Sequence, residues 1–174
     1  SSGNASSSAA AYASKAGKRL ITILPESTPN NKILQAISYG SDVIKIPGNF
    51  SNSYEICKSI AEEHNLLNIT TTFNNPYATE GYKTIGYEIY EQLKKVPDWI
   101  VVPVGAGPIL VAIKWAFDEL KDMNIIKSMP RLVCVQAENC GPISSTFLRD
   151  NNYKVEACIN AEKTIASGID DSLY

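Results

Sequence analysis

Residues 98–120 constrain the fold of this chain more than any other stretch. An apolar run from Trp99 to Val104 precedes a Gly-Ala-Gly turn at residues 105–107, and apolar residues then recur at helical spacing. Continuous β-branched runs are typical of strands buried in parallel sheets. Pro108 suits the first position of a helix, because its missing N–H would have no intrahelical partner there. The sequence therefore predicts a parallel strand, a glycine turn and a helix.

The glycine turn is the first candidate for a binding site. Two glycines at alternate positions let the backbone approach a bound group, and free amides at a helix N-terminus favour an anion such as phosphate. The turn is not a dinucleotide fingerprint, because Leu110 stands where that pattern needs glycine, and no P-loop Gly-Lys-Ser/Thr follows. Such turns also occur without any ligand. This pattern alone therefore leaves phosphate binding and simple chain reversal open.

Strands and helices alternate along the rest of the chain. The expected helices are residues 5–17, residues 30–39, one capped by Ser51 or Ser53, a long one capped near Thr79, and one beginning at Gly141. The expected strands are residues 19–24, 42–46, 66–73 and 131–137. This order implies an α/β fold with parallel sheets and right-handed crossovers. The loop at 74–77 divides the chain into a small lobe, residues 1–73, and an incomplete large lobe, residues 74–174.

Composition excludes several classes of partner. The 174 residues are 44% hydrophobic and 20% charged with a net charge of −2, as in globular proteins. No basic block is present, so neither nucleic acid nor an anionic membrane is an expected partner. The longest apolar span falls short of the roughly 20 residues that cross a bilayer. The four cysteines form no CxxC pair, so we expect no metal site, and we expect reduced thiols in a cytoplasmic protein.

Four segments of the chain together carry a family resemblance. SSGN at residues 1–4 is followed by a small-residue helix, and NPYATEGYKTIGYEI occupies residues 75–89. VVPVGAGPIL follows at 101–110, and TIASGI at 164–169. These segments resemble, in this order, the asparagine loop, the Glu-Gly-x-Lys-Thr-Ile helix, the phosphate-binding turn and a later loop of one family. That family comprises the pyridoxal-phosphate enzymes of the tryptophan-synthase-β-like fold, and the helix resembles that of threonine synthases.

The resemblance implies a pyridoxal 5′-phosphate cofactor and a role for each matching residue. Asn4 would hydrogen-bond the phenolic oxygen of the pyridoxal ring. The residues implied at the cofactor phosphate are Gly105, Ala106, Gly107 and Ile109. Those implied at the substrate carboxylate are Ser1, Ser2, Gly3 and Ala5. Pro108 has no N–H, so this turn offers one amide fewer than a turn with a non-proline residue at position 108. The corners beside Asn4 and Gly107 are expected to hold opposite ends of one cofactor.

The family's Schiff-base lysine would precede residue 1, so the resemblance implies no catalytic residue within this chain. We therefore expect an internal, inactive fragment of a homodimeric enzyme with a small amino-acid substrate, converting O-phosphohomoserine and water into threonine and phosphate. Three alternatives stay open. These are a serine/threonine dehydratase or another β-replacement enzyme of the same fold, a paralogue without the lysine, and a non-catalytic α/β binding domain. Lys83 and Thr84 belong to the matching helix but have no implied role.

Overall fold

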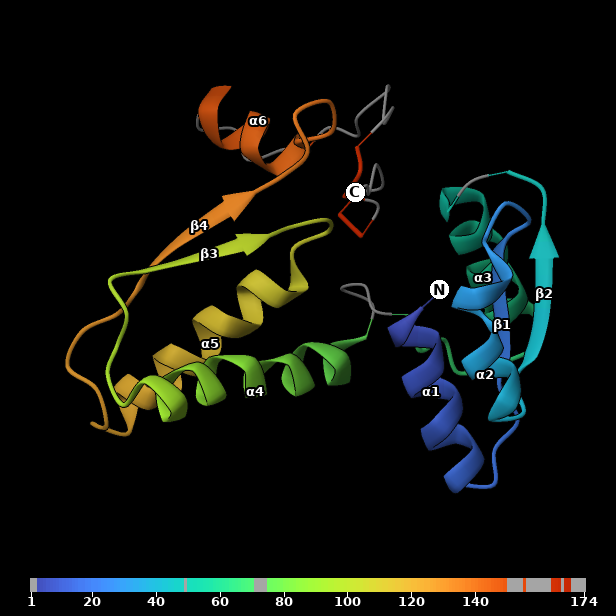
Figure 1. The fold of residues 1–174 in the computed structure, drawn as a ribbon, viewed down its shortest axis with the longest axis horizontal. Helices are drawn as coiled ribbons and strands as arrows, with labels where there is room; N and C mark the ends of the chain where they lie inside the picture. The colour runs from blue at the N-terminus through green and yellow to red at the C-terminus, as the bar shows by residue number, and fades with distance from the viewer. Residues whose placement is uncertain are drawn as a thin grey trace. The chain divides into compact units, whose positions relative to one another are not determined.

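The computed structural model describes residues 3–48, 50–70, 75–149, 155, 164–166 and 168–169. The chain divides into two compact units, Ser1–Thr70 and Thr71–Tyr174 (Figure 1). Each unit is described by itself below. Residues 71–74, where the sequence places the boundary between the two lobes, lie outside the described residues. The assignment of a small lobe ending at residue 73 stays a prediction.

The first unit contains a short parallel sheet with helices packed beside it. Its elements are α1 (Asn4–Lys15), β1 (Ile21–Pro25), the 3-10 helix η1 (Asn30–Lys32), α2 (Leu34–Ser38), β2 (Asp42–Ile46) and α3 (Phe50–Glu63). Strands β1 and β2 pair in parallel, with Ile21 opposite Asp42 and Pro25 opposite Ile46. Helix α3 packs on β1, and α1 packs on α2. Leu24 of β1 and Ala36 of α2 are fully buried in this unit.

Three local predictions for this unit need correction. The helix expected over residues 30–39 is split into η1 and α2 at Ile33, whose side chain is buried in the core. Helix α3 begins at Phe50, so neither Ser51 nor Ser53 is its cap; Ser53 is buried instead. Residues 66–70 form no strand, and residues 71–73 lie outside the described part. The Thr70 amide donates to Asn68 Oδ1 at 3.0 Å, a local bond that competes with strand pairing.

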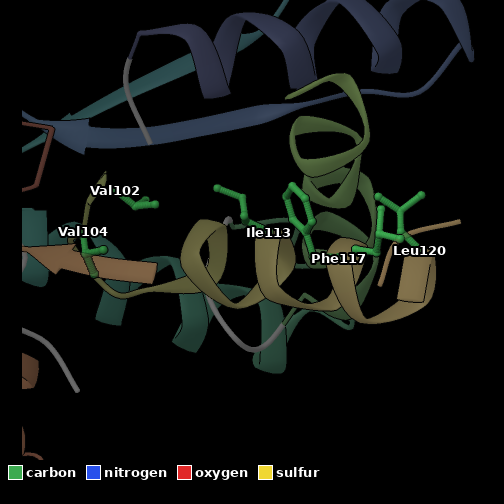
Figure 2. Close-up of a cluster of buried hydrophobic side chains, with 6 residues drawn as sticks. Val102, Val104, Ile113, Phe117 and Leu120 are labelled. Carbon is green, nitrogen blue, oxygen red and sulfur yellow. The ribbon is translucent and has the colours of Figure 1, made fainter. Parts of the chain in front are cut away.

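In the second unit, helix α5 packs against strand β4 of a parallel strand pair, and helix α4 packs along α5 (Figure 1). Its elements are α4 (Pro76–Leu93), β3 (Trp99–Pro103), α5 (Pro108–Asp122), β4 (Arg131–Val135) and α6 (Pro142–Arg149). Strands β3 and β4 pair in parallel, from Trp99 opposite Arg131 to Pro103 opposite Val135. Figure 2 shows the core, in which strand and turn residues meet α5: Val102, Val104, Ile113, Phe117 and Leu120. Among the described residues, Trp99 and Val101 of β3 leave much of their surface exposed on the other face, 55% and 62%.

Helix α4 begins three residues earlier than expected. The Asn75 side-chain oxygen accepts from the Ala78 amide at 3.2 Å, and Pro76 takes the first helical position. Asn before a proline is a strong helix start, since the side chain satisfies an orphan amide and the proline lacks one. The expected cap Thr79 therefore lies inside the helix, where it is buried.

The cysteines behave differently from one another. Cys57 and Cys134 are free thiols, as expected, and burial raises the pKa of the Cys134 thiol, which keeps it protonated. Cys140 is disulfide-bonded, so the expectation of four reduced thiols is wrong for this residue. Cys140 is buried at the end of a tight bridge with Ala137, just beyond β4. Spacing along the chain does not reveal that arrangement. Among the described residues, no cluster of three or more potential metal ligands occurs.

The parallel pairing in both units, with a helix between the paired strands, confirms the α/β prediction. Within the part of the chain that the structure describes, no helix combines the length and apolar character needed to span a bilayer.

Candidate functional site

The predicted phosphate turn lies where β3 passes into α5. Val104 is buried, and its amide donates to the Val135 carbonyl at 2.8 Å, which extends the pairing of β3 with β4 by one residue. The backbone then turns through Gly105 and Ala106 to Gly107, which caps α5 with φ of +99°. This left-handed conformation is strained for any residue with a Cβ. Glycine is therefore required at the last position of the turn, and Pro108 begins the helix as expected.

Three backbone amides at this turn are available as donors within the part of the chain that the structure describes. Among the described residues, no acceptor is bonded to the amides of Ala106, Gly107 or Ile109. Amides in the first turn of a helix have no intrahelical acceptor, and the helix dipole makes their surroundings positive. The first turn of α5 carries no acidic side chain that would repel an anion. These residues have the donor chemistry that a phosphate group needs.

A second corner, in the first unit, begins α1. Gly3 has φ of +70°, and its amide donates to the Lys32 carbonyl at 3.3 Å. The hydroxyls of Ser6 and Ser7 both donate to the Gly3 carbonyl at 3.0 Å, which holds this corner in place. Asn4 is the first residue of α1 and is exposed. Asn4 and Ala5 thus offer a carboxamide and amides at a helix N-terminus, whereas Ser1 and Ser2 lie outside the described residues.

The motif lysine, Lys83, joins α4 to α5 through an ionic network. Its Nζ lies 2.6 Å from Glu119 Oε1 and 2.5 Å from Glu80 Oε2, and the Lys83 side chain is only 12% exposed. The Tyr87 hydroxyl donates to the other oxygen of Glu119. The hydrogen bond to Glu119 raises the pKa of Lys83, and the bond from Lys83 lowers the pKa of Glu119. Lys83 is therefore a protonated interhelical contact and not a free amine.

Sequence reasoning missed Gln136, which immediately follows β4. Its Nε2 donates to the Gly105 carbonyl at 3.2 Å, so it contacts the turn directly. A signal was present: Gln136 is the first polar residue after an apolar strand, and ligand sites in parallel sheets gather at the carboxyl ends of strands.

The later loop, residues 164–169, matches the expectation of irregular structure over its described residues, and Thr164 Oγ1 accepts from the Ala166 amide at 3.0 Å.

Comparison with known proteins identifies the family. Residues 1–173 match the family model described as pyridoxal-phosphate dependent enzyme. The chain belongs to this family. The resemblance deduced from the four segments is thereby confirmed, as is pyridoxal phosphate as the family's cofactor. Its phosphate is an anion of the kind that the free amides at Ala106, Gly107 and Ile109 could hold.

Individual relatives narrow the comparison. The chain is 38% identical to the threonine synthase of Methanocaldococcus jannaschii over 149 residues, which cover 84% of this chain and 36% of that protein. It is 38% identical to the threonine synthase of Methanosarcina acetivorans over 82% of this chain and 35% of that protein. The chain therefore spans little more than a third of the length of these relatives.

Solved structures share the fold. The processed form of threonine deaminase isoform 2 from Solanum lycopersicum matches 98% of this chain with a TM-score of 0.80 and 21% identity, covering 46% of that protein. A pyridoxal 5′-phosphate-dependent aspartate racemase matches 96% of this chain with a TM-score of 0.76 and 23% identity, covering 48% of that protein. At such identities these likenesses establish the fold alone.

Proposed function

We propose that the whole protein is a threonine synthase that converts O-phosphohomoserine and water into threonine and phosphate. The observation that carries the proposal is the 38% identity to threonine synthases over more than four fifths of this chain. Sequence identity alone does not specify a reaction or a substrate. The 38% identity nevertheless exceeds the 21–23% identity to the deaminase and racemase structures. The Glu-Gly-Tyr-Lys-Thr-Ile run in α4, which resembles the threonine synthase helix, supports the same choice.

In this proposal the chain's own residues bind and orient. The amides of Ala106, Gly107 and Ile109 hold the cofactor phosphate, together with Gly105, and Asn4 donates to the phenolic oxygen of the ring. The residues proposed for the substrate carboxylate are Ser1, Ser2, Gly3 and Ala5. When bound, pyridoxal phosphate supplies an electron sink for reactions at the α-carbon of an amino acid. Backbone donors suit this task because they are fixed by the fold and need no reorganisation when the ligand arrives.

The reaction is tested with the full-length protein loaded with pyridoxal phosphate. The protein is incubated with O-phosphohomoserine, and inorganic phosphate and threonine are measured in parallel. Serine and threonine are supplied separately, and ammonia is measured. Release of phosphate and threonine in equal amounts is the expected result. Ammonia from serine or threonine, without phosphate release from O-phosphohomoserine, would instead identify a dehydratase.

Three further expectations belong to the same proposal. The whole protein is a homodimer, which sedimentation in an analytical ultracentrifuge tests. It is cytoplasmic, which fractionation of the source cells tests. The chain forms a small lobe over residues 1–73 and part of a large lobe over 74–174. Limited proteolysis that cuts first between residues 71 and 75 would support this boundary, whereas first cuts inside α4 would contradict it.

A further inference from the structure

We propose that Gln136 is a positioning residue that directs the Ala106 amide of the turn toward the bound phosphate. This inference deepens the proposed site: it rests on the turn binding the cofactor phosphate, not on the identity of the substrate. Gln136 acts through a carbonyl group of the turn.

The Gln136 carboxamide bridges two elements with its two different ends. Nε2 donates to the Gly105 carbonyl at 3.2 Å. Oε1 accepts from the Ser144 amide at 2.9 Å and from the Ser144 hydroxyl at 3.3 Å. The reversed orientation would place oxygen against the Gly105 oxygen and NH₂ against the Ser144 amide. Only the observed orientation satisfies both neighbours, because a carboxamide has one donor end and one acceptor end.

The hydrogen bond to the Gly105 carbonyl sets the direction of the Ala106 N–H, because both groups belong to the same peptide plane. A trans peptide is planar, so the Gly105 carbonyl and the Ala106 N–H point in opposite directions. Holding the carbonyl toward Gln136 therefore points this N–H away from β4. Glycine permits many backbone conformations, so the plane beside Gly105 would rotate more freely without such a bond. Within the described ranges the Ala106 amide has no bonded acceptor, and its direction matters to any anion bound there.

The two ends of Gln136 perform separable tasks. The bond from Ser144 satisfies an amide in the first turn of α6, which is a structural role common at helix ends. The bond to Gly105 orients the backbone of the turn and does not involve α6. Gln136→Glu separates the two, because a carboxylate still accepts from Ser144 but faces the Gly105 carbonyl with oxygen and repels it. Gln136→Met removes both bonds without adding a charge.

The test uses the full-length holoprotein and measures cofactor binding rather than turnover. Pyridoxal phosphate affinity is determined by absorbance titration, and the phosphate environment by the ³¹P resonance of the bound cofactor. At pH 8, Gln136→Glu and Gln136→Met should each bind about tenfold more weakly than the unchanged protein, which corresponds to about 1.4 kcal/mol. Their ³¹P resonance should shift or broaden. Ser144→Ala removes the 3.3 Å hydroxyl contact to Gln136 and the side-chain bond to Cys134 but keeps the amide bond to Gln136, so it should bind within twofold of the unchanged protein.

The pH dependence separates positioning from a purely structural effect. As the pH falls, the new carboxyl of Gln136→Glu becomes protonated and can again donate to Gly105. The affinity ratio to the unchanged protein should therefore recover toward one for Gln136→Glu and stay constant for Gln136→Met. An unchanged affinity and ³¹P resonance in both variants would overturn the inference, as would an equal loss in Ser144→Ala. Failure to release phosphate from O-phosphohomoserine would overturn the threonine synthase proposal alone, because these readouts need no substrate.

Discussion

Helix α4 lies close against α5 at Gly86, and one added methyl group tests whether this contact sets the spacing of the two helices. An ideal Cβ on Gly86 would lie 2.6 Å from Ala116 Cβ and 3.3 Å from the Ile113 carbonyl oxygen. Carbon atoms in contact normally lie about 3.5–4.0 Å apart. Ala116 is fully buried and cannot swing aside, so the helices must separate by on the order of 1 Å.

The expected change in unfolding free energy for Gly86→Ala is the difference between two opposing contributions. Overpacking of a core typically costs about 1–3 kcal/mol, and contact with both a side chain and the backbone places Gly86→Ala toward the upper end. Alanine is favoured over glycine inside a helix by about 1 kcal/mol. The net loss of unfolding free energy should therefore be about 1–2 kcal/mol. Gly81 lies in the same helix with nothing within 4 Å of an added Cβ, so Gly81→Ala should stabilise by about 0.5–1 kcal/mol.

Urea unfolding followed by circular dichroism measures both variants against the unchanged protein. The double variant Gly86→Ala/Ala116→Gly restores the space for one methyl group, so the two changes should couple favourably by at least about 1 kcal/mol. The reasoning fails if Gly86→Ala is as stable as Gly81→Ala. Additive effects in the double variant would likewise show that this contact does not set the spacing.

The remaining predictions concern a cap, an ion pair and the turn. Asn75→Ala should lower the unfolding free energy by about 1 kcal/mol in urea, because the Ala78 amide loses its acceptor, whereas Asn75→Asp should change it little. The pKa of Glu119 is held below its usual value by Lys83, so its stabilising contribution is present at neutral pH and is lost as the pH falls below the usual glutamate range and through the lowered pKa. Urea midpoints between pH 3 and 7 should therefore fall less steeply in Glu119→Gln, and parallel curves would contradict the ion pair. Gly107→Ala adds a Cβ at φ of +99° and should cost about 1–2 kcal/mol of stability while weakening pyridoxal phosphate binding. Fluorescence titration of the full-length protein checks the binding, and equal affinity would argue against the turn as the phosphate site.

The elements that sequence reasoning placed well are those whose signals are local. Strand β2 was predicted at its observed bounds, because a short segment rich in β-branched residues ends at Pro47-Gly48. The start of α5 follows from Gly107 and Pro108, which restrict the backbone whatever surrounds them. The starts of α3 and α4 were misplaced because several serines, threonines and asparagines compete as caps. Packing decides among such candidates, and Ser53 and Thr79 are taken into buried positions instead.

The interhelical lysine shows what a motif alone does not convey. Glu80, Lys83 and Tyr87 follow one another at helical spacing, so the sequence indicates that they share one side of α4. Glu80 pairs with Lys83, whereas Lys83 and Tyr87 share a partner, Glu119, which lies in α5, 36 residues beyond Lys83. Nothing in the local pattern marks Glu119 among the other acidic residues of that helix. The network could therefore be recognised only once the packing of the two helices was known.

Register explains why the turn and Gln136 meet although 31 residues separate Gly105 from Gln136. Parallel pairing aligns Pro103 with Val135, so the residues that follow β3 and β4 emerge at the same edge of the sheet. The Val104 amide donates to the Val135 carbonyl and carries this alignment one step further. A slip of one residue in the pairing would turn the Gln136 side chain to the other face of the sheet. The apolar contacts of Val102 and Val104 with α5 resist such a slip, so the same core that fixes the register also delivers a carboxamide to the turn.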